Sequence, residues 1–180
     1  MRIEPVLLCG AALLLGGAAF YWPGQGSLLV GVMLFWPLVD RGWRLPALPK
    51  GRGHYLAWAV LLGFAGGLLI GRSEAFSFFV STLLFAALPE EWFFRAWFMT
   101  RLGSSWSANL ATSVFFSLIH AMTQGPTRGV LVFVPSLCFG WLFQRSRDLP
   151  LNILIHALAN LFYFLYLAHY EARLLERFFG

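Results

Sequence analysis

Residues 5–39 read PVLLCGAALLLGGAAFYWPGQGSLLVGVMLFWPLV and contain no Asp, Glu, Lys or Arg. A helix needs about 20 apolar residues to cross the hydrocarbon layer of a bilayer, so this run is too long for a single crossing. The PGQG segment at residues 23–26 divides the run, because proline and glycine interrupt helices. The stretch therefore predicts two membrane-spanning helices, at about residues 5–22 and 27–39.

The whole chain shares this apolar character. Of its 180 residues, 59% are hydrophobic and 12% are charged, whereas a soluble domain carries about 25% charged residues. So little charge cannot cover a water-facing surface, which excludes a soluble globular enzyme and a disordered chain. The net charge is +5, but the basic residues stand singly between apolar runs, so nucleic-acid binding is excluded as well.

Polar, proline- and glycine-containing loops divide the rest of the chain into five further apolar segments. One segment contains Pro89, which removes a backbone hydrogen bond and should kink the helix. The sequence therefore predicts an all-α fold, a polytopic integral membrane bundle of about seven transmembrane helices that forms one domain over residues 1–180. The five further spans are 55–71, 75–102, 104–121, 129–144 and 151–169.

Two residue types predict packing and not chemistry. Glycines within spans are expected to let helices approach closely, and tryptophans near span ends are expected to lie in an aromatic belt at the headgroup level. The glycines are Gly16, Gly63, Gly66 and Gly67, and the tryptophans are Trp22, Trp36, Trp43, Trp58, Trp106 and Trp141.

The Lys and Arg residues outside the spans predict an orientation, because cytoplasmic loops carry an excess of basic residues. With the N-terminus inside, eight of them lie in cytoplasmic loops and four lie outside. We therefore expect a cytoplasmic N-terminus and an external C-terminus. The eight are Arg2, Arg41, Arg44, Lys50, Arg52, Arg101, Arg145 and Arg147, and the four are Arg72, Arg128, Arg173 and Arg177.

Polar residues inside apolar spans are candidates for function, because a charged side chain at the bilayer centre costs about 2.5–3.5 kcal/mol. The span 75–102 carries Glu90, Glu91 and Arg95. Glu91 and Arg95 are one helical turn apart with the acid first, which favours an ion pair, and a purely structural role for this pair is open. Glu90 is rotated by about 100° and cannot share Arg95 equally, so we expect it to be the carboxylate that does chemistry.

Two later spans carry imidazoles and amides. His120 ends one of them, and a lone histidine there could be structural. Asn152, His156 and Asn160 lie on one face of the last span at steps of four residues, with Tyr163 beside them. For Asn152 and Tyr163, a purely structural role in interhelical hydrogen bonds is an open alternative. We expect a functional role for His156 with Asn160, because both can donate hydrogen bonds into the same small volume.

The candidate set is therefore Glu90, His120, His156 and Asn160. A carboxylate with an imidazole can activate water, and an imidazole with an amide can donate hydrogen bonds to an oxyanion. The set includes no serine or cysteine beside a base, so a covalent acyl-enzyme is not expected.

The three segments resemble the signature of the CPBP intramembrane endopeptidases, which include the CAAX prenyl endopeptidases and bacteriocin-processing and immunity-type (Abi) relatives. That signature is Glu-Glu-x-x-x-Arg, then Phe-x-x-x-His, then His-x-x-x-Asn. Here the motifs begin at Glu90, Phe116 and His156, each on a separate predicted span. Each motif alone is weak, but the ordered set is specific, and the resemblance covers about residues 75–165.

The resemblance implies an intramembrane endopeptidase that hydrolyses a peptide bond of a membrane-associated protein or peptide. The chain is shorter than the eukaryotic prenyl-protein enzyme and has fewer spans, which fits compact relatives that process C-terminal membrane-sorting tags. The implied location is the bacterial inner membrane, and the implied partners are lipid and substrate. The implied roles are water activation by Glu90 and His120, an oxyanion hole of His156 and Asn160, and a supporting pair of Glu91 and Arg95.

Alternatives stay open for the metal and for the function. The family has been described both as metalloproteases and as glutamate-type proteases, and Glu90, His120 and His156 could supply a zinc ligand set. The chain has no His-Glu-x-x-His motif and asparagine is a poor zinc ligand, so we expect a glutamate-type enzyme without a cofactor. A transporter or proton-relay protein, which also keeps Glu and His within the membrane, and a non-catalytic assembly or immunity factor are the alternatives to a protease.

Overall fold

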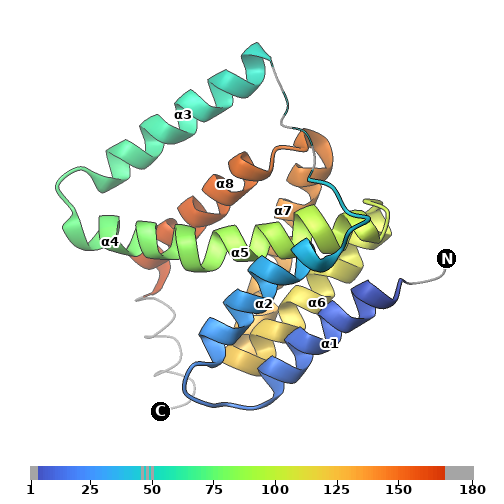
Figure 1. Ribbon diagram of the computed structural model, residues 1–180. Helices are drawn as coiled ribbons and strands as arrows, with labels where there is room; N and C mark the ends of the chain where they lie inside the picture. Colours follow the sequence, from blue (N-terminus) through green and yellow to red (C-terminus); the bar gives the residue numbers. More distant parts are fainter. Residues whose placement is uncertain (1–3, 46, 48, 50, 169–180) are drawn as a thin grey trace. The chain divides into compact units, whose positions relative to one another are not determined.

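The computed structural model describes residues 4–45, 47, 49 and 51–168, and every regular element in this part is helical (Figure 1). The all-α prediction is confirmed for these residues. The elements, with π-helical segments marked η, are α1 (Pro5–Ala19), α2 (Gln25–Val39), α3 (Arg52–Leu69), α4 (Ser73–Thr82), η1 (Leu83–Ala87), α5 (Leu88–Glu90), η2 (Glu91–Met99), α6 (Trp106–Gln124), α7 (Pro126–Ser146), α8 (Leu149–Phe162) and η3 (Tyr163–Leu167).

Each of the seven predicted spans corresponds to one helical stretch of the described chain, because α4 to η2 follow one another without a break and η3 continues α8. Two of these stretches, α7 and residues 149–167, are long and apolar enough to cross a membrane. The apolar helices α1, α2 and α3 are shorter, so a count of seven crossings stays a prediction. The orientation residues Arg2, Lys50, Arg173 and Arg177 lie outside the described part.

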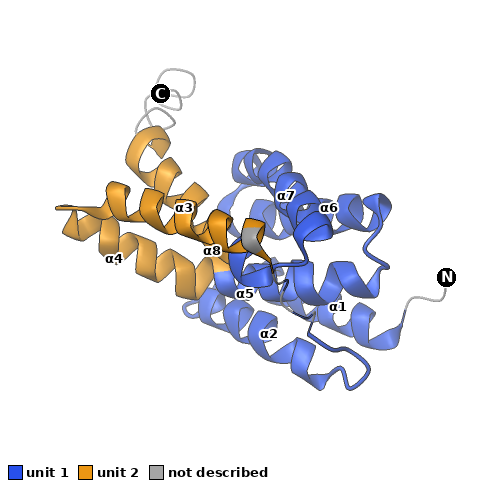
Figure 2. Cartoon of the chain, turned by 90° about the horizontal axis from the view of Figure 1, so that it is seen from above, with its two compact units in different colours: residues 1–49, 88–152 blue, residues 50–87, 153–180 orange. Residues whose placement is uncertain are grey.

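The chain divides into two compact units, which are coloured separately in Figure 2. Unit 1 comprises residues 1–49 and 88–152, and unit 2 comprises residues 50–87 and 153–180. This division does not test whether the chain folds as one domain, and that expectation stays a prediction.

In unit 1, α1 and α2 form a hairpin whose facing residues recur every three or four positions, as a helix period requires. The buried positions are Leu7, Gly10, Leu14 and Ala18 on α1, and Gln25, Leu29, Met33 and Pro37 on α2. The Gln25 amide donates to the carbonyls of Gly17, Ala18 and Phe20, at 3.0–3.2 Å, and so satisfies backbone oxygens that the end of α1 leaves without helical partners.

The η2 segment forms the centre of unit 1, since its residues from Phe93 to Met99 are all buried. Phe93, Phe94 and Trp97 pack with side chains of α1, α2 and α6 in one hydrophobic cluster. Three indoles add hydrogen bonds: Trp92 donates to Leu34 O at 3.1 Å, Trp43 donates to Ala96 O at 2.9 Å, and Trp97 donates to Asp40 Oδ2 at 2.9 Å. These bonds attach η2 to α2 and to the loop that follows it.

The proline predicted to interrupt the fourth span lies within the helical stretch. Pro89 has no N–H to donate, so the carbonyl four residues earlier, that of Phe85, has no α-helical partner. The π-helical segment η1 covers that position, and η2 begins two residues after the proline. Wider helical turns of this kind are frequent at functional sites.

The helices α6 and α7 pack closely through two glycines of α7. A Cβ at Gly129 would lie 2.6 Å from Ala121 Cβ and 2.8 Å from the Ser117 backbone oxygen. A Cβ at Gly140 would lie 1.8 Å from Asn109 Oδ1. These glycines therefore provide the close approach between helices.

The glycines expected from the sequence to make such contacts do not make them. Apart from chain neighbours and the backbone of the same helix, no described atom lies within 4 Å of a Cβ built on Gly16, Gly63, Gly66 or Gly67. That prediction was wrong, because a small residue permits close approach only where another helix crosses its face.

Five of the six tryptophans expected at the headgroup level divide into two groups, and the sixth, Trp58, is partly buried against the apolar cluster of unit 2. Trp22, Trp106 and Trp141 are exposed, as a belt requires. Trp36 donates to Val6 O at 3.1 Å and Trp43 donates to Ala96 O, so these two indoles connect elements. Anchoring at the membrane surface therefore does not fully explain Trp36 and Trp43, which also form hydrogen bonds between elements.

In unit 2, the second half of α8 packs against α3 and α4. Ala65, Ala75, Leu154, Leu158 and Leu161 form the buried cluster. These apolar contacts hold α4 and α8 side by side within the unit.

Candidate active site

The clearest arrangement of polar groups in unit 1 is the pair formed by Glu90 and His120. Glu90 ends α5, and its Oε1 lies 3.9 Å from Nε2 of His120 in the last part of α6. The two side chains are 15% and 13% exposed, respectively, so they are largely enclosed and still reachable. A separation of 3.9 Å is longer than a direct hydrogen bond, so the two groups lie side by side without one.

The hydrogen bond of the other ring nitrogen, Nδ1, determines which nitrogen of the His120 imidazole carries the proton. Its Nδ1 lies 3.0 Å from the carbonyl oxygen of Phe116, and a carbonyl can only accept a hydrogen bond. Nδ1 is therefore the donor, and in the neutral ring Nε2 carries the lone pair that faces Glu90. An ionised Glu90 and a neutral His120 of this tautomer can each accept a hydrogen bond from one water molecule beside them.

The neighbouring carboxylate, Glu91, has a different environment. It is fully buried, and its Oε2 lies 3.3 Å from Nε of Arg95, which is the ion pair expected from their spacing. Asn152 at the start of α8 donates from its Nδ2 to the same oxygen. Glu91 is thus held by one cation and one amide within unit 1.

Arg95 connects this cluster to α7 and α6. Its Nη2 donates to the Ser136 carbonyl oxygen at 3.2 Å and to Ser136 Oγ at 3.1 Å. Its guanidinium carbon lies 5.1 Å from the centre of the Phe116 ring. The ring of Phe116 in turn lies 4.2 Å from that of His120, so the buried ion pair and the histidine share one aromatic neighbour.

The remaining two predicted residues lie in unit 2, on α8. His156 is buried, and Asn160 follows one helical turn later. The Asn160 amide donates from Nδ2 to Thr82 Oγ1, at 2.9 Å. The structure therefore brings Glu90 and His120 together in unit 1, and it places His156 and Asn160 on one helix in unit 2.

The comparisons with known proteins agree with the three motifs. Residues 71–162, 92 of the 180 residues, match a family model described as type II CAAX prenyl endopeptidase Rce1-like. The chain belongs to this family. The comparisons with curated proteins and with solved structures each returned no match.

Membership in the CAAX prenyl endopeptidase family makes this chain a protease that acts on a peptide or protein in a membrane setting. The family resemblance read from the sequence is confirmed. The matched region runs from the turn before α4 to the end of α8 and contains all three motifs. The individual roles of the motif residues stay predictions.

Several polar residues of this endopeptidase that contact the motifs, or the helical stretch that carries the first motif, were not singled out from the sequence. Thr82, Ser136 and Asp40 are all buried. A buried hydroxyl within an apolar span was the available signal for Thr82 and Ser136. Asp40 directly follows the predicted span 27–39, so no signal of an apolar span marked it.

Asp40 joins the end of α2 to the end of the helical stretch that carries the first motif. Its Oδ2 accepts from Arg101 Nε at 2.6 Å and from Trp97 Nε1 at 2.9 Å, and Arg101 Nη2 pairs with Oδ1. The hydrogen bonds from Arg101 lower the pKa of this carboxyl, burial opposes them, and the Trp97 bond and the Arg101 charge act in the lowering direction.

Two further features bear on the site. In the described part of the chain, no three His, Cys, Asp or Glu side chains are grouped so that they could hold a metal ion.

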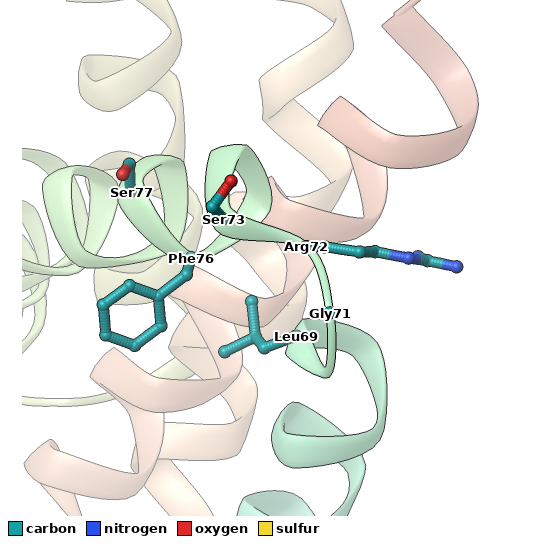
Figure 3. Close-up of a pocket in the computed structure, with 6 residues that line it drawn as sticks. All are labelled: Leu69, Gly71, Arg72, Ser73, Phe76 and Ser77. Carbon is teal, nitrogen blue, oxygen red and sulfur yellow. The ribbon is translucent and has the colours of Figure 1, made fainter.

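A pocket of about 540 Å³ lies at the turn between α3 and α4, where Leu69 and Phe76 face the same space and Arg72 points away (Figure 3). No motif residue lines this pocket; its lining residues are Leu69, Gly71, Arg72, Ser73, Phe76 and Ser77.

Proposed function

We propose that this protein is an intramembrane endopeptidase of the glutamate type, in which Glu90 and His120 activate the water that attacks a peptide bond. The observation that carries the proposal is the geometry of this pair: Glu90 Oε1 lies 3.9 Å from His120 Nε2, and the Phe116 carbonyl fixes the other ring nitrogen as a donor. Two proton acceptors beside one reachable space are what activation of water needs.

The proposed reaction begins when one water molecule donates a hydrogen bond to each of the two groups. Its oxygen attacks the carbonyl carbon while its proton moves to Glu90, and a tetrahedral oxyanion forms. His156 and Asn160 donate hydrogen bonds to that oxyanion, as the family resemblance implies. The carbon–nitrogen bond then breaks, Glu90 returns the proton to the leaving amine, and the acid and amine products separate.

Glu91 and Arg95 act in this proposal as structural support. The Glu91 carboxylate is fully buried and contacts Arg95 and Asn152, so it is less accessible to a water molecule than Glu90. Glu91 therefore stabilises the structure of the site, while Glu90 acts as the general base.

We propose as substrate a protein with a membrane-associated C-terminal sorting tag, the class processed by compact relatives. The location proposed is the bacterial inner membrane, with about seven crossings, a cytoplasmic N-terminus and an external C-terminus. The distribution of Lys and Arg supports the orientation.

The test compares cells that express the wild type, Glu90→Gln or Glu74→Gln, and identifies new peptide termini by mass spectrometry. Glu90→Gln keeps the size of the side chain and removes the base, so we expect it to abolish cleavage, with His120→Ala nearly as severe. Glu74 is an exposed carboxylate of α4 and provides the matched control, which should behave as the wild type. Equal thermal midpoints in detergent would show that the fold is intact.

Wild-type turnover by purified Glu90→Gln would overturn the assignment. A transporter would show flux without a peptide product, and a non-catalytic factor would show neither. Intact tagged substrate in cells that express the wild type would count against the proposed substrate class.

The metal question needs a separate arm of the same assay. We expect purified protein to keep its activity after dialysis against a chelator. Activity that is lost on dialysis and restored by zinc alone would replace the glutamate-type mechanism with a metal-dependent one.

A further inference from the structure

The Thr82 side chain forms a hydrogen bond with the side chain of Asn160. It is the last residue of α4, it is 9% exposed, and its Oγ1 accepts a 2.9 Å hydrogen bond from Asn160 Nδ2. Both residues belong to unit 2, and Thr82 lies outside the three motifs. The contact joins positions 78 residues apart in the chain, so it depends on packing.

A second contact fixes the register of these two helices. Phe78 and Phe164 stack with ring centroids 4.2 Å apart and planes 10° from parallel. Phe78 precedes Thr82 by four residues, and Phe164 follows Asn160 by four. The helices therefore run antiparallel with one turn between the two contacts, and the aromatic stack holds the hydroxyl opposite the amide.

The chemistry of the two groups explains what the contact can do. The Asn160 amide is planar and carries two N–H donors, so a hydrogen bond through one of them fixes the direction of the other. An oxyanion donor contributes most when it is oriented before the reaction, because no free energy is then spent on reorganisation. A threonine is suited to hold it, since branching at Cβ restricts the side-chain rotamers.

We propose that Thr82 is a positioning residue for the oxyanion hole: it holds the Asn160 amide so that the second N–H is available to the developing negative charge. This inference rests on the proposed function. If the hydrogen bond served only to join helices, its loss would lower the thermal midpoint and leave kcat unchanged. A positioning role instead predicts a lower kcat.

The experiment uses Thr82→Val, which removes the hydroxyl and keeps the shape, and Thr82→Ser, which keeps the hydroxyl. Thr112→Val is the matched control, because Thr112 is also a buried helical threonine and its hydroxyl donates to the backbone of its own helix, at Ala108 O. The substrate is the peptide found by comparing the wild type with Glu90→Gln. For each purified variant, kcat, KM and the thermal midpoint are measured.

We expect Thr82→Val to lower kcat about tenfold with an unchanged KM, the size of one neutral hydrogen bond. Thr82→Ser should keep kcat within about threefold, and Thr112→Val should match the wild type. If Thr82→Val does not fold, Thr82→Ala compared with Thr82→Ser makes the same distinction. A wild-type kcat in any folded variant that lacks the Thr82 hydroxyl would overturn the inference.

The double variant separates this inference from the proposed function. Asn160→Ala should lower the rate by about 10²–10³, and adding Thr82→Val to it should have no further effect if Thr82 acts through Asn160. Full additivity would overturn the positioning role and leave the proposed function standing. A wild-type rate for Asn160→Ala would instead show that the oxyanion assignment itself is wrong.

Discussion

At the scale of single residues, two adjacent glutamates have different environments because a helix turns by about 100° per residue. Glu91 faces the interior and meets Arg95 and Asn152, whereas Glu90 faces His120 and keeps 15% of its side chain exposed. Breaking a buried pair such as that of Glu91 costs about 3–5 kcal/mol, since the partner is left as an uncompensated charge. Two adjacent positions thus have different proposed roles: Glu91 supports the structure of the site, and Glu90 is the proposed base.

A second residue-scale effect predicts how stability depends on pH. The pKa of Asp40 lies below its ordinary value of 3.8 in the folded chain, mainly because Arg101 donates hydrogen bonds to it. A carboxyl of this kind stabilises the fold fully above pH 3.8, and this contribution is lost as the pH falls through the folded pKa. The thermal midpoint of the wild type should therefore decrease in acid, below about pH 4.

Asp40→Asn tests this prediction. At neutral pH it should destabilise the fold by about 1.5–3 kcal/mol, the size of hydrogen bonds to a charged group. It should also flatten the acid decrease, because asparagine does not titrate. Thermal scans in detergent at several pH values measure both effects, with Glu74→Gln as the control. An unchanged acid slope in Asp40→Asn would contradict the explanation.

At the scale of elements, η2 depends on side-chain donors, one from the loop after α2 and one from its own C-terminal end. Trp43 and the Thr100 hydroxyl both donate to Ala96 O, at 2.9 and 2.5 Å. A helix that changes its hydrogen-bond register leaves carbonyls to be satisfied, and these side chains satisfy one of them. The first motif is therefore positioned by α2 and the following loop, which contain no motif residue.

The packing of α6 against α7 supports an element-scale prediction. Gly129→Ala should destabilise the fold by about 1–3 kcal/mol, because its Cβ would meet the Ser117 backbone oxygen at 2.8 Å and one of the helices must shift. Gly67→Ala on α3 is the matched control, since a Cβ there would meet no described atom within 4 Å apart from its own helix backbone and chain neighbours. We expect the control to be neutral or slightly stabilising. Equal thermal midpoints for the two variants would contradict the close approach.

At the scale of the whole molecule, apolar side chains cover much of the exposed surface. Examples are Phe20, Ile70, Phe85 and Val130, each at least 67% exposed. Exposed apolar surface of this extent indicates contact with a membrane, in agreement with the family. A lipid-facing helix needs no polar outer face, which explains why so few charged residues suffice.

The proposed orientation is a prediction at this scale. A reporter enzyme that is active only outside the cytoplasm, fused after Gly180, should be active, and the same reporter placed before Met1 should be inactive. The excess of basic residues in the predicted cytoplasmic loops is the physical reason. A cytoplasmic reporter at the C-terminus would refute an odd number of crossings with the N-terminus inside.

Much of the fold and part of the site could be predicted because the information is local. Long apolar runs imply helices in a bilayer, and each predicted span corresponds to a described helical stretch. The Glu91–Arg95 pair follows from a spacing of four, and the three ordered motifs by themselves indicate the family. These features depend on neighbours within one helix or on the residues themselves.

Contacts between helices were decided by the tertiary structure. Thr82 meets Asn160, Asn152 meets Glu91, and Asp40 meets Trp97 across separations of 57 to 78 residues. Such contacts depend on how far each helix is rotated and where it crosses its neighbour, which side-chain packing settles. For the same reason, Gly129 and Gly140 allow close packing while Gly63 and Gly67 do not, although all four are glycines within apolar helices.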